Sequence, residues 1–246
     1  MWICCLQIIP VHIEKEIVPT DDLSDLILKS QEIKEGDIIV VAQKIVSKQE
    51  GRLIKLSTVT PSLLAEGISS QYKKDPRITE LILSESKRII RMHNGVLIVE
   101  SNHGFICANA GVDESNVEQG YATLLPKDSD ISAQNIRDNI LERTQKHVAV
   151  IISDTFGRPF RMGQTNCAIG VSGLNPILDY VGTLDSFDNV LRVTAIAIAD
   201  ELASAAELAM GKSLKCPFVI IRGYRFEIED CVTSKLIRPE NEDLFR

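Results

Sequence analysis

An unbroken apolar run at residues 148–152, ending abruptly in Ser153, Asp154 and Thr155, is the feature that most limits how this chain can fold. Runs of this kind, without alternation of polar residues, are typical of strands buried on both faces of a sheet. Residues 38–42 and 218–221 have the same character. We therefore expect a covered central sheet with the polar triplet at its rim, where oxygen ligands commonly hold a metal or a phosphate. The alternative is an ordinary turn begun by an aspartate.

The remaining elements come in an irregular order, which favours an α+β fold with mixed and antiparallel sheets over a regular βαβ alternation. The expected elements are a strand over 3–9 stopped by Pro10, helices over 22–30, 60–72, 75–91 and 132–144, a strand over 96–99 with a hairpin partner at 104–107, a long irregular segment over 163–188 and the longest helix over 192–210. On that last helix, alanines recur on one face and Asp200, Ser204 and Glu207 fall on another. No G-x-G-x-x-G or Walker A sequence is present.

Length, charge and cysteine content limit the kinds of protein and partner that fit this sequence. The 246 residues allow one large domain or two small ones, and the net charge of −7 without a basic tract argues against nucleic acid as a partner. No stretch approaches the roughly 18 apolar residues of a membrane helix, so no membrane partner is expected. The six cysteines include no C-x-x-C pair, which indicates reduced thiols, a cytoplasmic location and no zinc site.

Two carboxylates stand out as candidate metal ligands. Asp113 and Asp154 each end a segment of small or apolar residues, and oxygen-bearing side chains follow them at Ser115, Asn116 and Thr155. Two carboxylates brought together repel each other unless a cation or a proton lies between them. With hydroxyl and amide help they suit Mg²⁺ or Mn²⁺ rather than Zn²⁺. The alternative is that the two aspartates begin two independent turns, because the sequence alone does not show that the fold brings them close together.

Two pairs of cations are candidates for binding anions. Lys44 and Lys48 lie four residues apart after a buried strand, where they could neutralise phosphate oxygens. Arg158 and Arg161 follow Asp154 closely and could bind a phosphate or carboxylate. Solvated lysines and surface ion pairs are the alternatives. The histidines have structural or surface contexts and no G-x-S-x-G occurs, so no catalytic residue is assigned.

A set of short segments in fixed order carries a resemblance to a known family. They are 42–52 (AQKIVSKQEGR), 108–116 (ANAGVDESN), 153–158 (SDTFGR), 168–176 (AIGVSGLNP) and 199–203 (ADELA). Together they closely resemble the coenzyme F420-0:L-glutamate ligase (F420:gamma-glutamyl ligase) family, over about residues 10–224. The resemblance implies an unusual, family-specific α+β fold in an intertwined homodimer. It also implies a single ligase domain over 1–246, which could comprise two interleaved lobes, without a C-terminal nitroreductase-like domain.

The resemblance also implies an activity and a set of site residues. The family adds L-glutamate to F420-0 with GTP, two divalent ions (Mg²⁺ or Mn²⁺) and K⁺ as an activator. Asp113 and Asp154 match its metal carboxylates, and Thr155 matches a ligand of the second metal. The positions matching its nucleotide contacts are His12, Ile13, Gln43, Lys44, Lys48, Asn116, Met210, Gly211, Lys212 and Ser213. We assign Arg158 and Arg161 to the F420-0 phosphodiester or the incoming carboxylates.

One departure from the family pattern concerns the second metal. Some members carry an acidic residue where this chain has Lys212, so one ligand of that ion is unassigned. The implied chemistry is amide formation through an acyl phosphate made with GTP. A metal-dependent nucleotide hydrolase using the same carboxylates, or a non-catalytic protein that binds F420 or nucleotide, are the alternatives. The number of glutamates added, the preference between GTP and ATP and the general base stay open.

Overall fold

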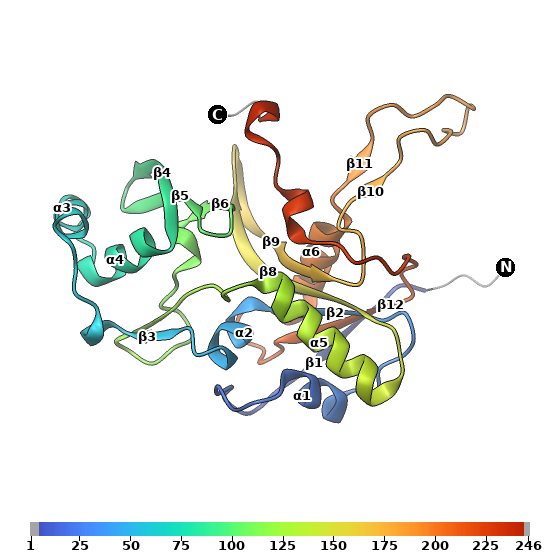
Figure 1. The fold of residues 1–246 in the computed structure, drawn as a ribbon, viewed down its shortest axis with the longest axis horizontal. Coiled ribbons are helices and arrows are strands. Elements are labelled where there is room, and N and C mark those ends of the chain that lie inside the picture. The colour runs from blue at the N-terminus through green and yellow to red at the C-terminus, as the bar shows by residue number, and fades with distance from the viewer. Residues whose placement is uncertain (1–4, 244–246) are drawn as a thin grey trace.

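A five-stranded sheet lies at the centre of the structure, a computed structural model that describes residues 5–243 (Figure 1). Its strand order is β1-β12-β2-β8-β9. The strands are β1 (Gln7–Val11), β12 (Phe218–Arg222), β2 (Ile38–Ala42), β8 (Ala149–Arg158) and β9 (Arg161–Ser172). β2 and β8 are parallel, and the other neighbours are antiparallel. The three apolar runs of the sequence are thus adjacent central strands, and the expected mixed sheet is confirmed.

The end of β8 extends beyond its neighbour β2. The last residue of β2, Ala42, pairs with Ser153, whereas β8 continues to Arg158 as a long hairpin with β9. A register shift leaves Ile169 between the pairs Ile152–Gly170 and Ser153–Ala168. Asp154 therefore lies on a segment of β8 that is paired on one side only, next to a bulge that increases the local twist.

Helices cover both faces of this sheet. On one face α1 (Leu23–Ser30) and α5 (Ser129–Thr144) enclose a core that includes Val150 and Ile152. On the other face α6 (Ile198–Met210) packs over a core that includes Ala149 and Ile151. Successive strand residues point to opposite faces, so β8 contributes alternate side chains to the two cores.

The face of α6 that meets the sheet is rich in alanine, as the sequence predicted for Ala199 and Ala206, whereas Ala195 of the predicted stripe is exposed in β11. Ala199, Ala203 and Ala206 are fully buried, which lets the helix backbone approach the sheet closely. The predicted polar face of α6 contacts β9. Each of its side chains, Asp200, Ser204 and Glu207, forms a hydrogen bond with a residue of that strand.

A second group of elements lies beside the central sheet, at the left of Figure 1. It comprises α3 (Leu63–Tyr72), α4 (Pro76–Ser84) and an antiparallel sheet of β4 (Ser86–His93), β5 (Val96–Ser101) and β6 (Ile106–Ala108). These enclose a separate core. β3 (Leu53–Lys55) pairs with β7 (Tyr121–Thr123), while β10 (Leu178–Asp179) pairs with β11 (Ala195–Ile196) in a projecting hairpin. The α+β class is confirmed.

Two of the predicted elements are wrong because strand pairing overrides the local pattern. The helix expected over 75–91 ends at Ser84, and β4 follows, since that segment pairs with β5. Residues 163–172 of the segment expected to be irregular over 163–188 belong to β9, which pairs with β8, whereas the part from 173 to 188 is mostly turns and loop around the short β10. The glycines and asparagines of this segment are typical of loops, which is why a loop was predicted. Local sequence does not reveal that part of the segment pairs with β8.

Other boundaries also differ. Pro10 does not stop β1, because β1 is an edge strand and a missing N–H is tolerated there. The expected start of that strand at residue 3 lies outside the described residues. The helix expected from 192 begins at Ile198, after β11, and α5 with 16 residues is longer than α6 with 13.

Two expectations from composition concern membranes and cysteines. Within residues 5–243, no helix combines the length and the apolar character needed to cross a bilayer. The described cysteines, Cys5, Cys107, Cys167, Cys216 and Cys231, are free thiols. Burial raises the pKa of Cys107 to about 12 and that of Cys167 to about 11, so both thiols stay protonated and are poor nucleophiles.

Candidate functional site

A cavity of about 830 Å³ opens where β2 and β8 end. It is bounded by α2 (Gln43–Gln49), the segment from 107 to 116, the end of β8 and the turn after α6. The predicted site residues that line it are Asp113, Asp154, Thr155, Ile13, Gln43, Lys44, Lys48, Asn116, Met210, Gly211 and Lys212. The structure thus brings the two predicted carboxylates and most of the predicted nucleotide positions together in one place.

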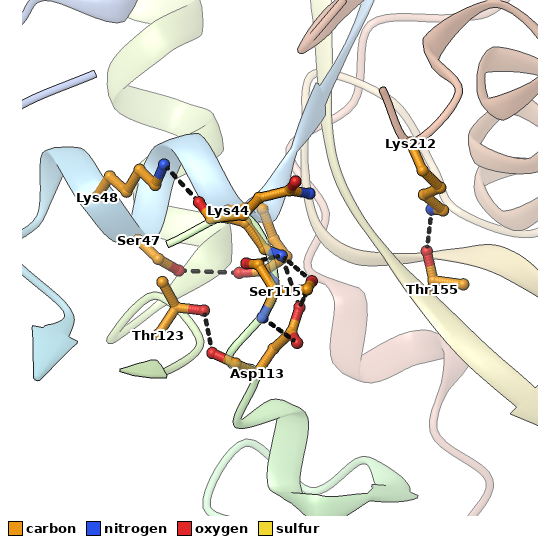
Figure 2. Close-up of polar contacts among 10 residues, drawn as sticks. Lys44, Ser47, Lys48, Asp113, Ser115, Thr123, Thr155 and Lys212 are labelled. Carbon is orange, nitrogen blue, oxygen red and sulfur yellow. Dashed lines mark hydrogen bonds and ion pairs between the residues drawn. The ribbon is translucent and has the colours of Figure 1, made fainter. Parts of the chain in front are cut away.

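Lys44 holds Asp113 in position. Its ammonium donates to Oδ2 of Asp113 at 2.6 Å and to the carbonyl and hydroxyl oxygens of Ser115, each at 2.8 Å (Figure 2). The backbone N–H of Ser115 donates to Oδ1 at 2.9 Å, and its hydroxyl donates to Oδ2 at 2.6 Å. Although burial opposes it, these hydrogen bonds from Lys44 and Ser115 keep the pKa of Asp113 below its usual value. Asp113 is therefore a fixed anion.

The backbone before Asp113 is unusual. Asn109, Ala110 and Gly111 all have positive φ, at 54°, 53° and 74°. A Cβ on Gly111 would lie 2.6 Å from Cγ of the buried Leu125. Only glycine fits this approach without displacement, so Gly111 sets the path by which the chain reaches Asp113.

Asp154 lies in a different environment. Its carboxylate is half-buried at the end of β8, and Gln43 from the start of α2 donates to it. Burial raises the pKa of Asp154 to about 6, and the charge of Asp113 adds to this effect, while Lys44 acts against it. The two acids thus have pKa values shifted in opposite directions.

The carboxylate pair is suited to a hard divalent cation. Carboxylate oxygens are ligands that Mg²⁺ and Mn²⁺ prefer, and a cation would offset the buried charge of Asp154. Within residues 5–243, no group of three or more His, Cys, Asp or Glu side chains is placed to hold a metal. An ion at this pair would therefore need water or substrate oxygens to complete its coordination.

Thr155 points to the other side of β8. Its hydroxyl donates to Oδ1 of Asn166 at 2.8 Å and accepts from Lys212 Nζ at 2.6 Å. Asn166 in turn donates to Oε2 of Glu207 at 3.0 Å, and Lys212 forms an ion pair with Oε1 of Glu207 at 2.9 Å. In Figure 2 this contact lies apart from the group around Asp113. We call Thr155, Asn166, Glu207 and Lys212 the α6-side cluster.

Sequence reasoning missed two members of this cluster. Glu207 was predicted to lie on a polar face of its helix, but local sequence does not show which element packs against that face. Asn166 was placed in an irregular segment, whereas it lies opposite Thr155 in the β8–β9 pairing. Only the register of that hairpin, which is a long-range property, could have identified Asn166.

Lys48 lies at the rim of the cavity. It follows Lys44 by one helical turn on α2, pairs with Glu16 and donates to the carbonyl of Asn116 at 3.1 Å. Gln43 anchors the start of the same helix by accepting from Ser47 Oγ at 2.9 Å. α2 therefore presents three of the predicted residues to the cavity from one short segment.

Some predicted residues do not line the cavity. His12 lies beside it, with Nδ1 3.0 Å from the carbonyl of Leu214, and Ser213 is in the neighbouring turn. Arg158 and Arg161 lie near the end of the β8–β9 hairpin, where Arg158 donates to the carbonyls of Met162 and Gly163. A substrate that reached these arginines would have to extend along the hairpin from the cavity.

Comparison with known proteins gives one consistent result. The sequence profile of the family described as F420-0:Gamma-glutamyl ligase matches residues 13–223. The chain is 47% identical to the coenzyme F420:L-glutamate ligase of Methanothermobacter thermautotrophicus over 92% of its length and 93% of that protein. It is 43% identical to the protein of the same name from Methanopyrus kandleri, over 98% of both chains, and 45% identical to that from Methanocaldococcus jannaschii, over 92% of its length and 90% of that protein. The chain therefore belongs to the F420-0:gamma-glutamyl ligase family.

Proposed function

We propose that this protein is a ligase that joins L-glutamate to coenzyme F420-0 in a GTP-dependent reaction. Family membership supports the reaction, because the relatives named above are coenzyme F420:L-glutamate ligases. The observation that carries the proposal is the convergence of Asp113, Asp154, Lys44 and Lys48 on one cavity. A pair of carboxylates with a pair of ammonium groups suits the binding of a metal–nucleotide complex.

The reaction we propose is amide formation through an acyl phosphate. A carboxylate is a poor electrophile, so transfer of the terminal phosphoryl group of GTP to the F420-0 carboxylate would activate it. Attack by the glutamate amine would then release phosphate, leaving an amide. Phosphoryl transfer needs mostly positioning and charge neutralisation, and bound Mg²⁺ or Mn²⁺ would supply part of that neutralisation.

The chain's own residues have defined tasks in this scheme. Asp113 and Asp154 would hold the ion, with Lys44 fixing Asp113 and Gln43 orienting Asp154. Lys48, at the rim, is placed to contact phosphate oxygens once they displace Glu16, whose side chain is exposed. Arg158 and Arg161 are proposed to contact anionic groups of F420-0, and K⁺ is proposed as an activator.

We propose a homodimer as the working form, in the cytoplasm. Two projecting hairpins carry exposed apolar side chains: Met162 is 94% exposed near the end of β8–β9, and Val193 is 88% exposed beside β11. Phe187, at 83%, lies on the same hairpin as Val193. A second copy of this chain that covered these side chains would bury apolar area that a monomer leaves in water.

The decisive experiment is a product assay. The protein is incubated with F420-0, L-glutamate, GTP and Mn²⁺, and products are analysed by mass spectrometry. A product heavier by one or more glutamyl units is expected, and ATP in place of GTP measures nucleotide preference. GTP turnover that proceeds equally without F420-0 and glutamate would instead indicate a nucleotide hydrolase. Binding of F420-0 or nucleotide without turnover would indicate a non-catalytic binding protein.

A further inference from the structure

The α6-side cluster already contains a cation. The ammonium of Lys212 lies within hydrogen-bond distance of Thr155 Oγ1, at 2.6 Å, and of Glu207 Oε1, at 2.9 Å. Asn166 connects these two oxygens, because it accepts from Thr155 and donates to Glu207. A hydroxyl, a carboxylate and an amide are thus arranged around one positive charge at the wall of the cavity.

This arrangement leaves little coordination capacity for another cation. The Thr155 hydroxyl uses its proton toward Asn166 and one lone pair toward Lys212. Both oxygens of the Glu207 carboxylate have partners. A divalent ion at Thr155 would have to displace the ammonium and would lie beside it, which is electrostatically unfavourable. The donor set here therefore does not fit the second ion expected from the sequence.

The contrast with the other face of β8 is clear. Asp154 points toward α2, where Gln43 donates to it, whereas Thr155 points toward α6 and already contacts a cation. Ser153 lies on the same face as Thr155 and lines the cavity. Its hydroxyl is buried and has no hydrogen-bond partner within the described part of the chain. A phosphate oxygen near Lys212 could accept from that hydroxyl.

We infer that Lys212 supplies the second positive charge of the cavity, so that this chain binds one divalent ion, at Asp113 and Asp154, rather than two. The Lys212 ammonium contacts the nucleotide's phosphate oxygens from the α6 side. This inference rests on the proposed function for the identity of the ligand. Thr155 and Glu207 take two of the three N–H donors of the Lys212 ammonium, and the side chain is 64% exposed, so the third donor can reach a phosphate oxygen while the other two contacts remain.

The test is to count bound Mn²⁺ by electron paramagnetic resonance, on protein with one equivalent of guanylyl imidodiphosphate. The wild-type complex is expected to bind one Mn²⁺ per chain, with an uncoupled signal. Lys212→Gln removes the charge, offers an amide oxygen and frees Glu207, so it should bind two ions with a coupled signal. Lys212→Arg keeps the charge and should bind one. Lys212→Gln with Glu207→Gln lacks the carboxylate and should also bind one.

Two results would overturn the inference: two coupled ions in the wild-type complex, or a single ion in Lys212→Gln. Circular dichroism of each variant verifies that it is folded. The count does not depend on catalysis, so it is separable from the proposed function. Wild-type protein that binds one ion but forms no glutamyl product would refute the ligase proposal alone. Product formation with two bound ions would refute the assignment of Lys212 alone.

Discussion

Lys44 Nζ lies 2.6 Å from Oδ2 of Asp113, so one of the two carboxylates predicted to bind metal has a lysine counter-ion in direct contact. Asp154 forms no such ion pair within residues 5–243, and Lys44 acts on it only through space. The two acids should therefore respond differently to neutralisation, to pH and to metal.

Replacing Asp154 by Asn should stabilise the metal-free protein while abolishing ligase activity. The folded-state pKa of about 6 means that the buried carboxylate is unfavourable at pH 7, by about 1–2 kcal/mol after allowance for partial exposure. Urea unfolding in EDTA at pH 7 measures the gain. Asp113→Asn is the matched control and should not stabilise, because hydrogen bonds lower the pKa of Asp113. Equal effects of the two substitutions would contradict this assignment.

Metal affinity should fall in acid. The folded pKa of Asp154 is raised above its unfolded value, so its contribution to stability is fully present below about pH 4 and is lost as pH rises through about 6. A divalent ion needs the deprotonated form. Below pH 6 the apparent Mn²⁺ affinity should therefore drop about tenfold per pH unit. Mn²⁺ titrations followed by electron paramagnetic resonance between pH 5 and 7.5 measure this, and a flat profile would exclude Asp154 as a ligand.

Gly111→Ala should destabilise the protein and weaken Mn²⁺ binding. The new Cβ would lie 2.6 Å from Leu125 Cγ on a backbone with φ of 74°, so steric overlap adds to strain, at a total of about 2–4 kcal/mol. Gly36→Ala is the control. It has a similar φ of 76° but nothing within 4 Å, so it should cost about 1 kcal/mol and leave Mn²⁺ binding unchanged. If both variants bound Mn²⁺ normally, Gly111 would not position Asp113.

Phe187→Ser with Val193→Ser should convert the proposed homodimer into monomers. Both side chains are more than four-fifths exposed on the β10–β11 hairpin, at 83% and 88%, and their apolar area would be buried against a second copy. Light scattering after size exclusion measures the mass. Leu63→Ser, at an 87% exposed position on α3, is the control and should stay dimeric. A wild-type monomer, or a dimer unaffected by the double substitution, would contradict the proposed interface.

The sequence predicted those parts of the fold that local patterns determine. The buried strands at 38–42, 148–152 and 218–221 were recognised because nothing polar interrupts them, and all three are in the central sheet. The carboxylates and lysines of the cavity were recognised from their positions at the ends of apolar or small-residue segments, and the resemblance to the family assigned them to one site. β4 and β9 were missed because their strand state depends on partners elsewhere in the chain.

The α6-side cluster could not be predicted for the same reason. Lys212 was recognised as a departure from the family pattern, but its contacts with Thr155 and Glu207 depend on where the turn after α6 meets the end of β8. Asn166 depends on hairpin register, which a bulge at Ile169 shifts by one residue.

The alternation of side chains along β8 divides the site into two halves. Asp154 and Thr155 are adjacent in sequence, yet their side chains leave β8 in opposite directions, one toward α2 and the other toward α6. Removing one residue from β8 ahead of Ser153 would exchange the two directions and point the carboxylate at Lys212. The side of β8 from which the carboxylate projects thus depends on the number of residues that precede it in the strand. Insertions or deletions in β8 should therefore be far less tolerated than substitutions.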